Sequence, residues 1–406
     1  MSNSPIRVRP VITKDELRLA TELMAKTHGQ NYFSSMEWLE RHGNLYPDFF
    51  MEHTRISHYQ GELAGALRIT TETLRIGEAR LKMGGIGWVT TAPKFRNLGV
   101  ATALMGDAIQ YMRQHQYHIS MLFGIPRFYH RFQYATSLSD YSIRVDVAEI
   151  PIPSNYENYR LRSVKPSDIQ AIQRMHQEGD RFASCSILRS EAHITNKWEQ
   201  FKHAHVIIDE DGAAVGYFLG KLRDTVYHII EAGSQDSNVV PLVLAGCATT
   251  AKSILLRSLV IDLPPYHSIS MYLKQFNALF EMKREHDRGG MLRFIEMEEA
   301  MESMIPEWEF RISESLLREL KIEITFLIKG VPFRLRSIRG AIDISSVNGY
   351  NKFSVTDEEF LHLVTGYLPF SEIYEESRRL ISPSARLLLE ALFPERNPYV
   401  YNFDRF

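Results

Sequence analysis

Apolar and polar residues along the first 150 positions alternate between a two-residue period and a helical period. Thr13 precedes an apolar-periodic stretch and Glu16 follows three residues later, a pairing typical of a helix capping box. Further along, alternation on both sides of Gln60-Gly61-Glu62 predicts a β-hairpin. The expected elements are a strand and helix over 9–28, the hairpin over 53–70 and a strand over 81–92.

A second amphipathic helix follows that strand. Val100, Leu104, Ala108 and Met112 recur every four residues and form one apolar face. After this helix, the sequence predicts a buried strand over 118–124, a helix start over 127–134 and a closing strand over 141–150. Together these elements predict an α/β domain spanning residues 1–150.

The same order of elements begins again after two prolines in the polar segment 150–159. A hairpin turning at Asp211-Gly212 lies between a strand–helix pair and a further strand, helix and strand, and no glycine phosphate signature accompanies them. We therefore expect residues 157–290 to be a degenerate second copy. Residues 291–406 predict a third, α+β domain that opens with the segment 291–304 and contains a β-like stretch over 323–338, helical stretches over 357–377 and 384–394, and an aromatic tail over 396–406.

Charge and cysteine content narrow the function classes. The chain has 47 basic and 49 acidic side chains without a basic block, so nothing predicts a nucleic-acid partner. Cys185 and Cys247 cannot build a disulfide framework, and no His/Cys cluster has metal-ligand spacing, so we expect no metal. No apolar run has the length of a signal peptide core or a membrane span. The expected location is the cytoplasm.

A glycine at the junction between a strand and a helix is the first candidate binding feature. The first turn of a helix carries unpaired N–H groups and the positive end of the helix dipole, so an anion binds there where side chains leave room. Gly99 clears that space, Arg96 adds a cation, and the small Ala101 and Thr102 let a diphosphate lie close to the amides. The alternative is a plain turn that uses glycine for its φ freedom.

The stretch VTTAPKFRNLGVATAL resembles the VxVxPxxRxxGxA signature of the GCN5-related N-acetyltransferases (GNAT), with Thr91 and Asn97 as departures. The resemblance implies that the strand before the signature separates from its neighbour and that backbone groups at Val89 and Thr91 pair with the pantetheine arm of acetyl-CoA. It also implies a mixed, splayed central sheet. The pyrophosphate would bind the amides of Arg96, Asn97, Leu98, Gly99, Val100, Ala101 and Thr102.

A tyrosine thirty residues after Gly99 completes the catalytic resemblance. Tyr129, in FYHRFQY, stands where the family has the tyrosine of FYxxxGF, with Gln133 in place of the glycine. A tyrosine with a pKa near 10 is protonated at pH 7, so it can donate a proton to a departing thiolate. The alternative reading is a core aromatic residue.

The order of the domains and the form of the tail resemble the enhanced-intracellular-survival (Eis-like) acetyltransferases: a GNAT domain, a degenerate second GNAT domain and a sterol-carrier-protein-like third domain. The resemblance implies a homo-oligomer, a hexamer in that family, and a terminal carboxylate that acts as the base. By this resemblance the base would be the α-carboxylate of Phe406, and the alternative is a solvated terminus. The neighbouring Arg405 would lower the pKa of that carboxylate and repel a polycationic substrate, which Asp404 would offset if it faces the pocket.

The acceptor pocket is the least defined part of the prediction. The family lines it with acidic and aromatic groups, and Glu37, Trp38, Asp48 and Phe49 stand at that place, with a surface helix as the alternative. The sequence thus predicts an acetyl-CoA-dependent N-acetyltransferase that acts on a small-molecule or peptide amine. A different class stays open, in which the chain is a CoA-sensing or lipid-binding scaffold that uses the third domain's interior.

Overall fold

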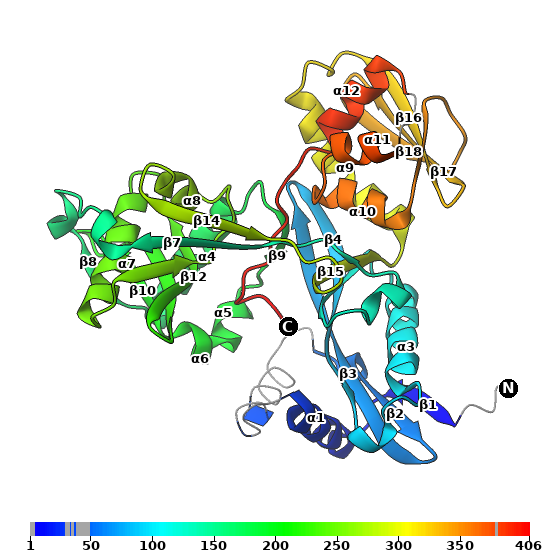
Figure 1. Ribbon diagram of the computed structural model, residues 1–406, viewed down its shortest axis with the longest axis horizontal. Helices are drawn as coiled ribbons and strands as arrows, with labels where there is room; N and C mark the ends of the chain where they lie inside the picture. The colour runs from blue at the N-terminus through cyan, green and yellow to red at the C-terminus, as the bar shows by residue number, and fades with distance from the viewer. Residues whose placement is uncertain (1–4, 29–32, 34–35, 38–48, 378–380) are drawn as a thin grey trace.

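The computed structural model describes residues 5–28, 33, 36–37, 49–377 and 381–406, and these residues form three β-sheets with helices packed on them (Figure 1). The first and third sheets lie close together, and the second forms a separate lobe. Among the described residues, no helix is both long and apolar enough to cross a lipid bilayer.

The first sheet is the scaffold of the candidate site. The predicted hairpin, strand and amphipathic helix are all confirmed, as is the capping box, in which the Glu16 N–H donates to Thr13 Oγ1 at 3.2 Å. Helices α1 (Lys14–His28) and α3 (Val100–Gln114) pack on opposite faces, because alternating residues such as Ala66 and Leu67 belong to different cores. The strand order is β1 (Ile6–Pro10), β2 (Thr54–Tyr59), β3 (Glu62–Ile76), β4 (Ala79–Thr91), β5 (Ile119–Gly124), β15 (Gly289–Phe294) and β6 (Ala135–Thr136), with β9 (Ser184–Leu188) also paired to β3.

The second sheet repeats this plan. Strands β12 and β13 are parallel, as β4 and β5 are, and α4 (Ile169–Gly179) and α7 (Val240–Ser253) pack on opposite faces. The order is β8 (Arg160–Ser163), β10 (Ala204–Ile208), β11 (Ala214–Arg223), β12 (Val226–Ser234), β13 (Ser258–Ile261), β7 (Asp140–Asp146) and β14 (Ala278–Lys283). Helices α5 (Ala192–Asn196), α6 (Trp198–Phe201) and α8 (Ser268–Leu273) complete this lobe.

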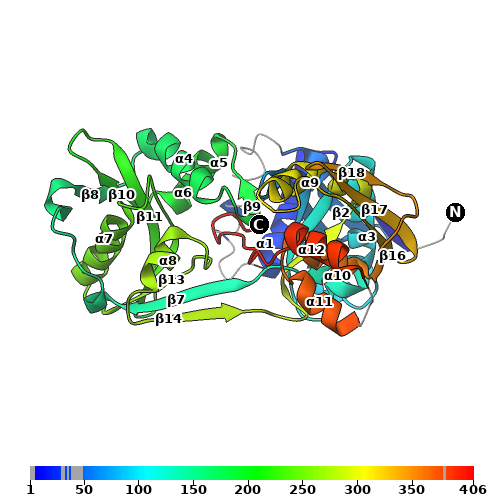
Figure 2. The same cartoon turned by 90° about the horizontal axis from the view of Figure 1, so that it is seen from above.

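The first and second sheets exchange one strand each. Strand β7 follows β6 in sequence but lies between β13 and β14, while β15 follows β14 but lies between β5 and β6. The closing strand expected for the first domain over 141–150 is therefore in the second sheet, and Met291 is in the first sheet rather than at the start of the third domain. Strands β7 and β14 run side by side from one lobe toward the other (Figure 2). Sheet membership thus departs from the predicted boundaries at 150 and 290.

The third sheet has the order β18 (Ala341–Ser345), β17 (Val331–Ile338), β16 (Lys321–Ile328) and β19 (Lys352–Val355). The segment 291–304, which opens the predicted third domain, contains the end of β15 and the start of α9, and the helix expected over 357–377 is interrupted at Gly366, which has φ 70°. The apolar core of this region is continuous with Leu74, Leu81 and Met83 of the first sheet. The helices are α9 (Met297–Ser313), α10 (Asp357–Thr365), α11 (Phe370–Ser377) and α12 (Pro383–Leu392).

The chain ends at the junction of the lobes rather than on the outer surface. After α12, the tail runs back to the centre of the molecule (Figure 1). Tyr399, Val400, Tyr401 and Phe403 are buried along it. The burial of these side chains favours the ordered tail, which ends with Phe406 at the first sheet.

Candidate active site

The last residue of the chain lies against strand β4. A Cβ atom added at Gly87 would lie 3.3 Å from the carboxyl carbon of Phe406, and one added at Gly85 would overlap the Phe406 ring. The ring of Phe123, on β5, meets the Phe406 ring edge-on at 5.9 Å between centroids. The two glycines therefore supply the room that the terminal residue occupies. The cavity here is lined by Phe49, His53, Arg68, Ile69, Thr70, Thr71, Glu72, Gly87, Trp88, Lys197, Asp404, Arg405 and Phe406.

Strands β4 and β5 separate beside this cavity. Their parallel pairing runs from Met83–Ile119 to Ile86–Leu122 and stops there, although β4 continues to Thr91. Trp88 has φ 57°, a left-handed conformation that marks an irregularity just past the last paired residue. The backbone of β4 beyond Ile86 is thus not paired with β5. The Val89 carbonyl instead lies 3.0 Å from His28 Nε2 at the end of α1.

The loop before α3 has the geometry of an anion site. Asn97 and Gly99 both have left-handed φ values, 64° and 85°, and Gly99 is the N-cap of α3. A Cβ added at Gly99 would meet only Ile6 Cδ1, at 3.7 Å, so the space above the first turn is open. Arg96, Asn97, Leu98, Gly99 and Thr102 are exposed, Ala101 is half-buried, and Val100 is buried in the core. Six of the seven predicted phosphate-loop residues therefore retain access to solvent.

Tyr129 is buried outside the cavity that holds Phe406. It begins the short 3₁₀ turn η3 (Tyr129–Phe132), whereas the sequence predicted the start of an α-helix. The turn ends at Gln133, which has φ 63° and occupies the left-handed position where the family has glycine. Burial raises the pKa of Tyr129 to about 12, so its hydroxyl holds its proton at neutral pH.

The predicted acceptor residues are only partly brought together. Phe49 lines the cavity, and the Arg68 guanidinium lies 5.0 Å from its ring centroid. Glu37 is exposed and is not among the residues that line the cavity. Trp38 and Asp48 lie outside the described residues. Burial lowers the pKa of Arg68 to about 10, which leaves it charged at neutral pH.

Asp404 and Arg405 differ from the prediction in their partners. Asp404 is 2% exposed and accepts two hydrogen bonds from Arg189, at 2.8 and 3.0 Å, so its charge is balanced from the protein side rather than offered to a ligand. Arg405 donates to Asp140 Oδ1 at 2.6 Å, and its guanidinium lies over the Phe123 ring. Asp404 and Arg405 both line the cavity, and each has its own ion-pair partner there, Arg189 for Asp404 and Asp140 for Arg405.

Sequence reasoning missed most of the cavity wall. Gly85 and Gly87 are spaced two apart on one face of β4, and this period is the signal that marks a close approach of another chain segment. Arg68, on β3, and Lys197, between α5 and α6, gave no local signal, since a lone basic residue in a strand or helix usually reaches solvent. Arg68 and Lys197 meet at the cavity only because of the sheet pairing and the course of the tail.

The comparison with protein families supplies the class of protein. The profile of the acetyltransferase (GNAT) domain matches residues 9–137, which contain the end of β1, strands β2 to β6, the open loop at Gly99 and Tyr129. The chain therefore carries a GNAT acetyltransferase domain and is an enzyme of the acetyltransferase class. No curated protein sequence matches the chain.

Solved structures share the fold over the whole chain. A GCN5-related N-acetyltransferase from Kribbella flavida has a TM-score of 0.76 at 17% identity, with 100% of both chains covered. A probable N-acyltransferase from Enterococcus faecalis has a TM-score of 0.76 at 15% identity, with 99% of both chains covered. Eis1 from Mycobacterium abscessus has a TM-score of 0.67 at 14% identity and covers 98% of this chain and 100% of its own. At these identities the likeness concerns the fold.

Gly85→Ala tests the contact between Phe406 and β4. The added methyl carbon would lie 2.4 Å from both Phe406 Cζ and Thr70 Oγ1, so the threonine side chain and the terminal ring would have to shift and the chain end would be loosened. Carboxypeptidase A removes a C-terminal aromatic residue and stops at arginine. It should release Phe406 from the Gly85→Ala variant at least tenfold faster than from the unsubstituted protein. Gly106→Ala is the control, because nothing lies within 4 Å of its added methyl group. Equal protection in both variants would contradict the contact.

Proposed function

We propose that the protein is an acetyl-CoA-dependent N-acetyltransferase in which an amine attacks the thioester directly and the Phe406 α-carboxylate accepts the amine proton. The observation that carries the proposal is the position of the Phe406 carboxyl group, against Gly87 where β4 leaves β5. A carboxylate at this position lies beside the strand whose backbone would bind the thioester arm. The GNAT domain match supports the reaction class.

Acetyl-CoA would bind along the first domain. The amides from Arg96 to Thr102 would hold its pyrophosphate, because the left-handed residues Asn97 and Gly99 open the first turn of α3. Backbone groups of Val89 and Thr91 would pair with the pantetheine arm, for which His28 has to give up the Val89 carbonyl. Acetyl-CoA supplies the acyl group and the thiol leaving group.

The transfer requires two proton movements. As the amine nitrogen bonds to the acetyl carbon, the acidity of its N–H rises sharply. A carboxylate with a pKa of about 3.5 can therefore accept the proton. The C–S bond then breaks, and Tyr129 donates its proton to the departing thiolate. Its pKa of about 12 fits this role as an acid, since the hydroxyl is protonated before the reaction. The products are the acetylated amine and CoA.

The remainder of the chain would support this reaction. We propose that the chain has three domains, of which the second is a degenerate GNAT domain and the third is sterol-carrier-protein-like. We also propose that it forms a homo-oligomer in the cytoplasm. The free, buried thiols of Cys185 and Cys247 fit a reducing compartment. The third domain's core is filled by rings such as Phe326, Phe353 and Phe360, which favours a supporting role over a lipid-binding scaffold.

Gly99→Glu tests the phosphate loop. The carboxylate should crowd the first turn of α3, strain a left-handed position and repel the pyrophosphate, so the dissociation constant for acetyl-CoA should rise at least tenfold, about 1.4 kcal/mol. Isothermal titration calorimetry measures the constant. Gly179→Glu, at the end of α4 in the second lobe, is the control for an added exposed charge, because Gly179 is exposed and nothing lies within 4 Å of an added Cβ. An unchanged constant in folded Gly99→Glu would remove the site from this loop.

Tyr129→Phe tests the acid. The ring keeps its packing and loses one proton donor, so turnover should fall by roughly 10² to 10⁴ with little change in acetyl-CoA affinity. Steady-state release of CoA, followed with a thiol reagent across a panel of amines, gives the turnover. Tyr227→Phe, a buried tyrosine of the second sheet, controls for loss of a hydroxyl. A variant that keeps more than half of the turnover would assign thiolate protonation to another group.

The chain end is tested by changing where it lies. Residues added after Phe406 should move the carboxylate out of the cavity. Deletion of Phe406 should leave the new terminal carboxylate about 3.5 Å away from the original position. Both changes should therefore abolish turnover without lowering the unfolding temperature. Phe406→Leu keeps the carboxylate and an apolar side chain, so its loss should be mild. Full turnover by the extended protein would refute the assignment of the base.

A further inference from the structure

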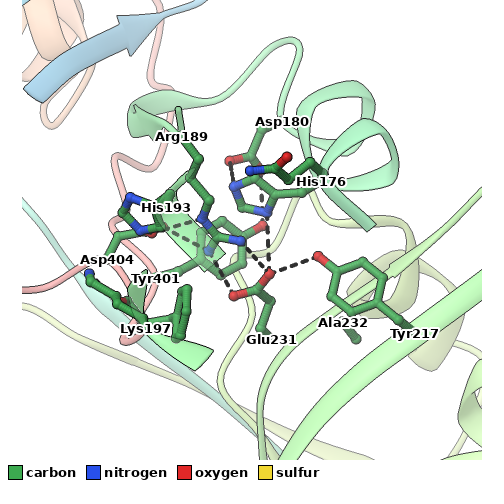
Figure 3. A network of polar contacts seen from close by, with 12 residues as sticks. His176, Asp180, Arg189, His193, Lys197, Tyr217, Glu231, Ala232, Tyr401 and Asp404 are labelled. Atoms are coloured by element: carbon green, nitrogen blue, oxygen red, sulfur yellow. Dashed lines mark hydrogen bonds and ion pairs between the residues drawn. The ribbon is translucent and has the colours of Figure 1, made fainter. Parts of the chain in front are cut away.

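A buried ion-pair network joins the tail to the second domain (Figure 3). The Arg189 guanidinium lies between two carboxylates: it donates to Asp404 of the tail at 2.8 and 3.0 Å, and to both oxygens of Glu231 on β12 at 2.7 Å. Glu231 also accepts a hydrogen bond from the Tyr217 hydroxyl at 2.8 Å. Each of the two carboxylates is thus held by the same cation in a bidentate geometry.

Other tail residues are fixed from the same side. Lys197 donates to the Phe403 carbonyl at 2.9 Å, and the Phe403 ring packs into the core of the second domain beside Phe201. The Tyr401 hydroxyl donates to Asp180 Oδ1 at 2.9 Å. The second domain therefore binds the tail between Tyr401 and Asp404, just ahead of the residues that contact the first sheet.

The three charged side chains at the centre of the network are almost completely buried. The side chains of Arg189, Glu231 and Asp404 are at most 1% exposed. Burial lowers the pKa of His193 to about 4, so this partner of Asp404 is neutral at pH 7. Burial raises the pKa of Asp180, a further carboxyl group of the network, and His176 Nδ1 lies 3.6 Å from Glu231 Oε1. Removal of the shared guanidinium would leave two buried carboxylates without their main partner.

Arg189 also has a fixed position relative to the first sheet. It directly follows β9, which pairs with β3 through Leu188–Thr73, and β3 supplies Thr70, Thr71 and Glu72 to the cavity of Phe406. Asp404 is two residues from the chain end, a reach of about 7 Å at most. A residue anchored on the first sheet therefore limits where the terminal carboxylate can lie.

We propose that the second domain is the receptor for the chain's own C-terminal tail, and that Arg189 is the positioning residue that sets the place of the Phe406 carboxylate through Asp404. The kinetic part of this inference rests on the function proposed above. The positional part does not, since it concerns only where the tail is bound.

Arg189→Met and Asp404→Asn test the inference on the full chain with two readouts. The first removes the shared cation, and the second changes only the tail and spares the body of the fold. Arg162→Met is the control, because Arg162 forms a bidentate pair with Asp168 in the same domain away from the tail. The readouts are the rate at which carboxypeptidase A releases Phe406 and, with acetyl-CoA affinity in parallel, steady-state turnover.

We expect both variants to release Phe406 at least tenfold faster than the control and to lose at least tenfold in turnover, with acetyl-CoA affinity changed less than twofold. Fast release with full turnover supports the receptor and overturns the carboxylate as base. Release as slow as in the control, in either folded variant, overturns the inference. If Arg189→Met does not fold, Asp404→Asn alone decides.

Discussion

The site depends on one buried guanidinium that balances two carboxylates from distant parts of the chain. Arg189 joins Glu231 of the second sheet to Asp404 of the tail, in an environment where an isolated charge would be very costly. Such a bridge gains little over an apolar contact in stability, but it is specific, because its bidentate geometry accepts few alternative positions of the tail. The position of the last residue follows from that specificity.

Strand exchange makes this bridge possible. Because β7 lies in the second sheet and β15 in the first, the two lobes cannot separate without breaking both sheets. Strand β9 adds a second link, since it lies in sequence between β8 and β10 of the second sheet and pairs with β3 of the first. The cavity wall thus combines residues from both lobes and the tail on a framework with fixed register.

The sequence predicted the local features well and the long-range ones poorly. The capping box at Thr13, the hairpin turn at Gln60 and the helix after Gly99 each depend on a few neighbouring residues, and all are confirmed. The exchange of β7 and β15 leaves no such trace, since either strand has the same pattern in either sheet. The partner of Asp404 was missed for a related reason: Arg189 lies 215 positions away and gives no motif.

The energetics of the tail show why polar contacts decide its place. Ordering the backbone of residues 399–406 costs about 8–16 kcal/mol. Burial of Tyr399, Val400, Tyr401 and Phe403 returns about 6–12 kcal/mol, so the apolar contacts come close to the cost without clearly exceeding it. The directional bonds from Arg189, Lys197 and the hydroxyl of Tyr401 then select one position of the tail. A tail so near balance is held in one position by its charged contacts rather than by its apolar surface.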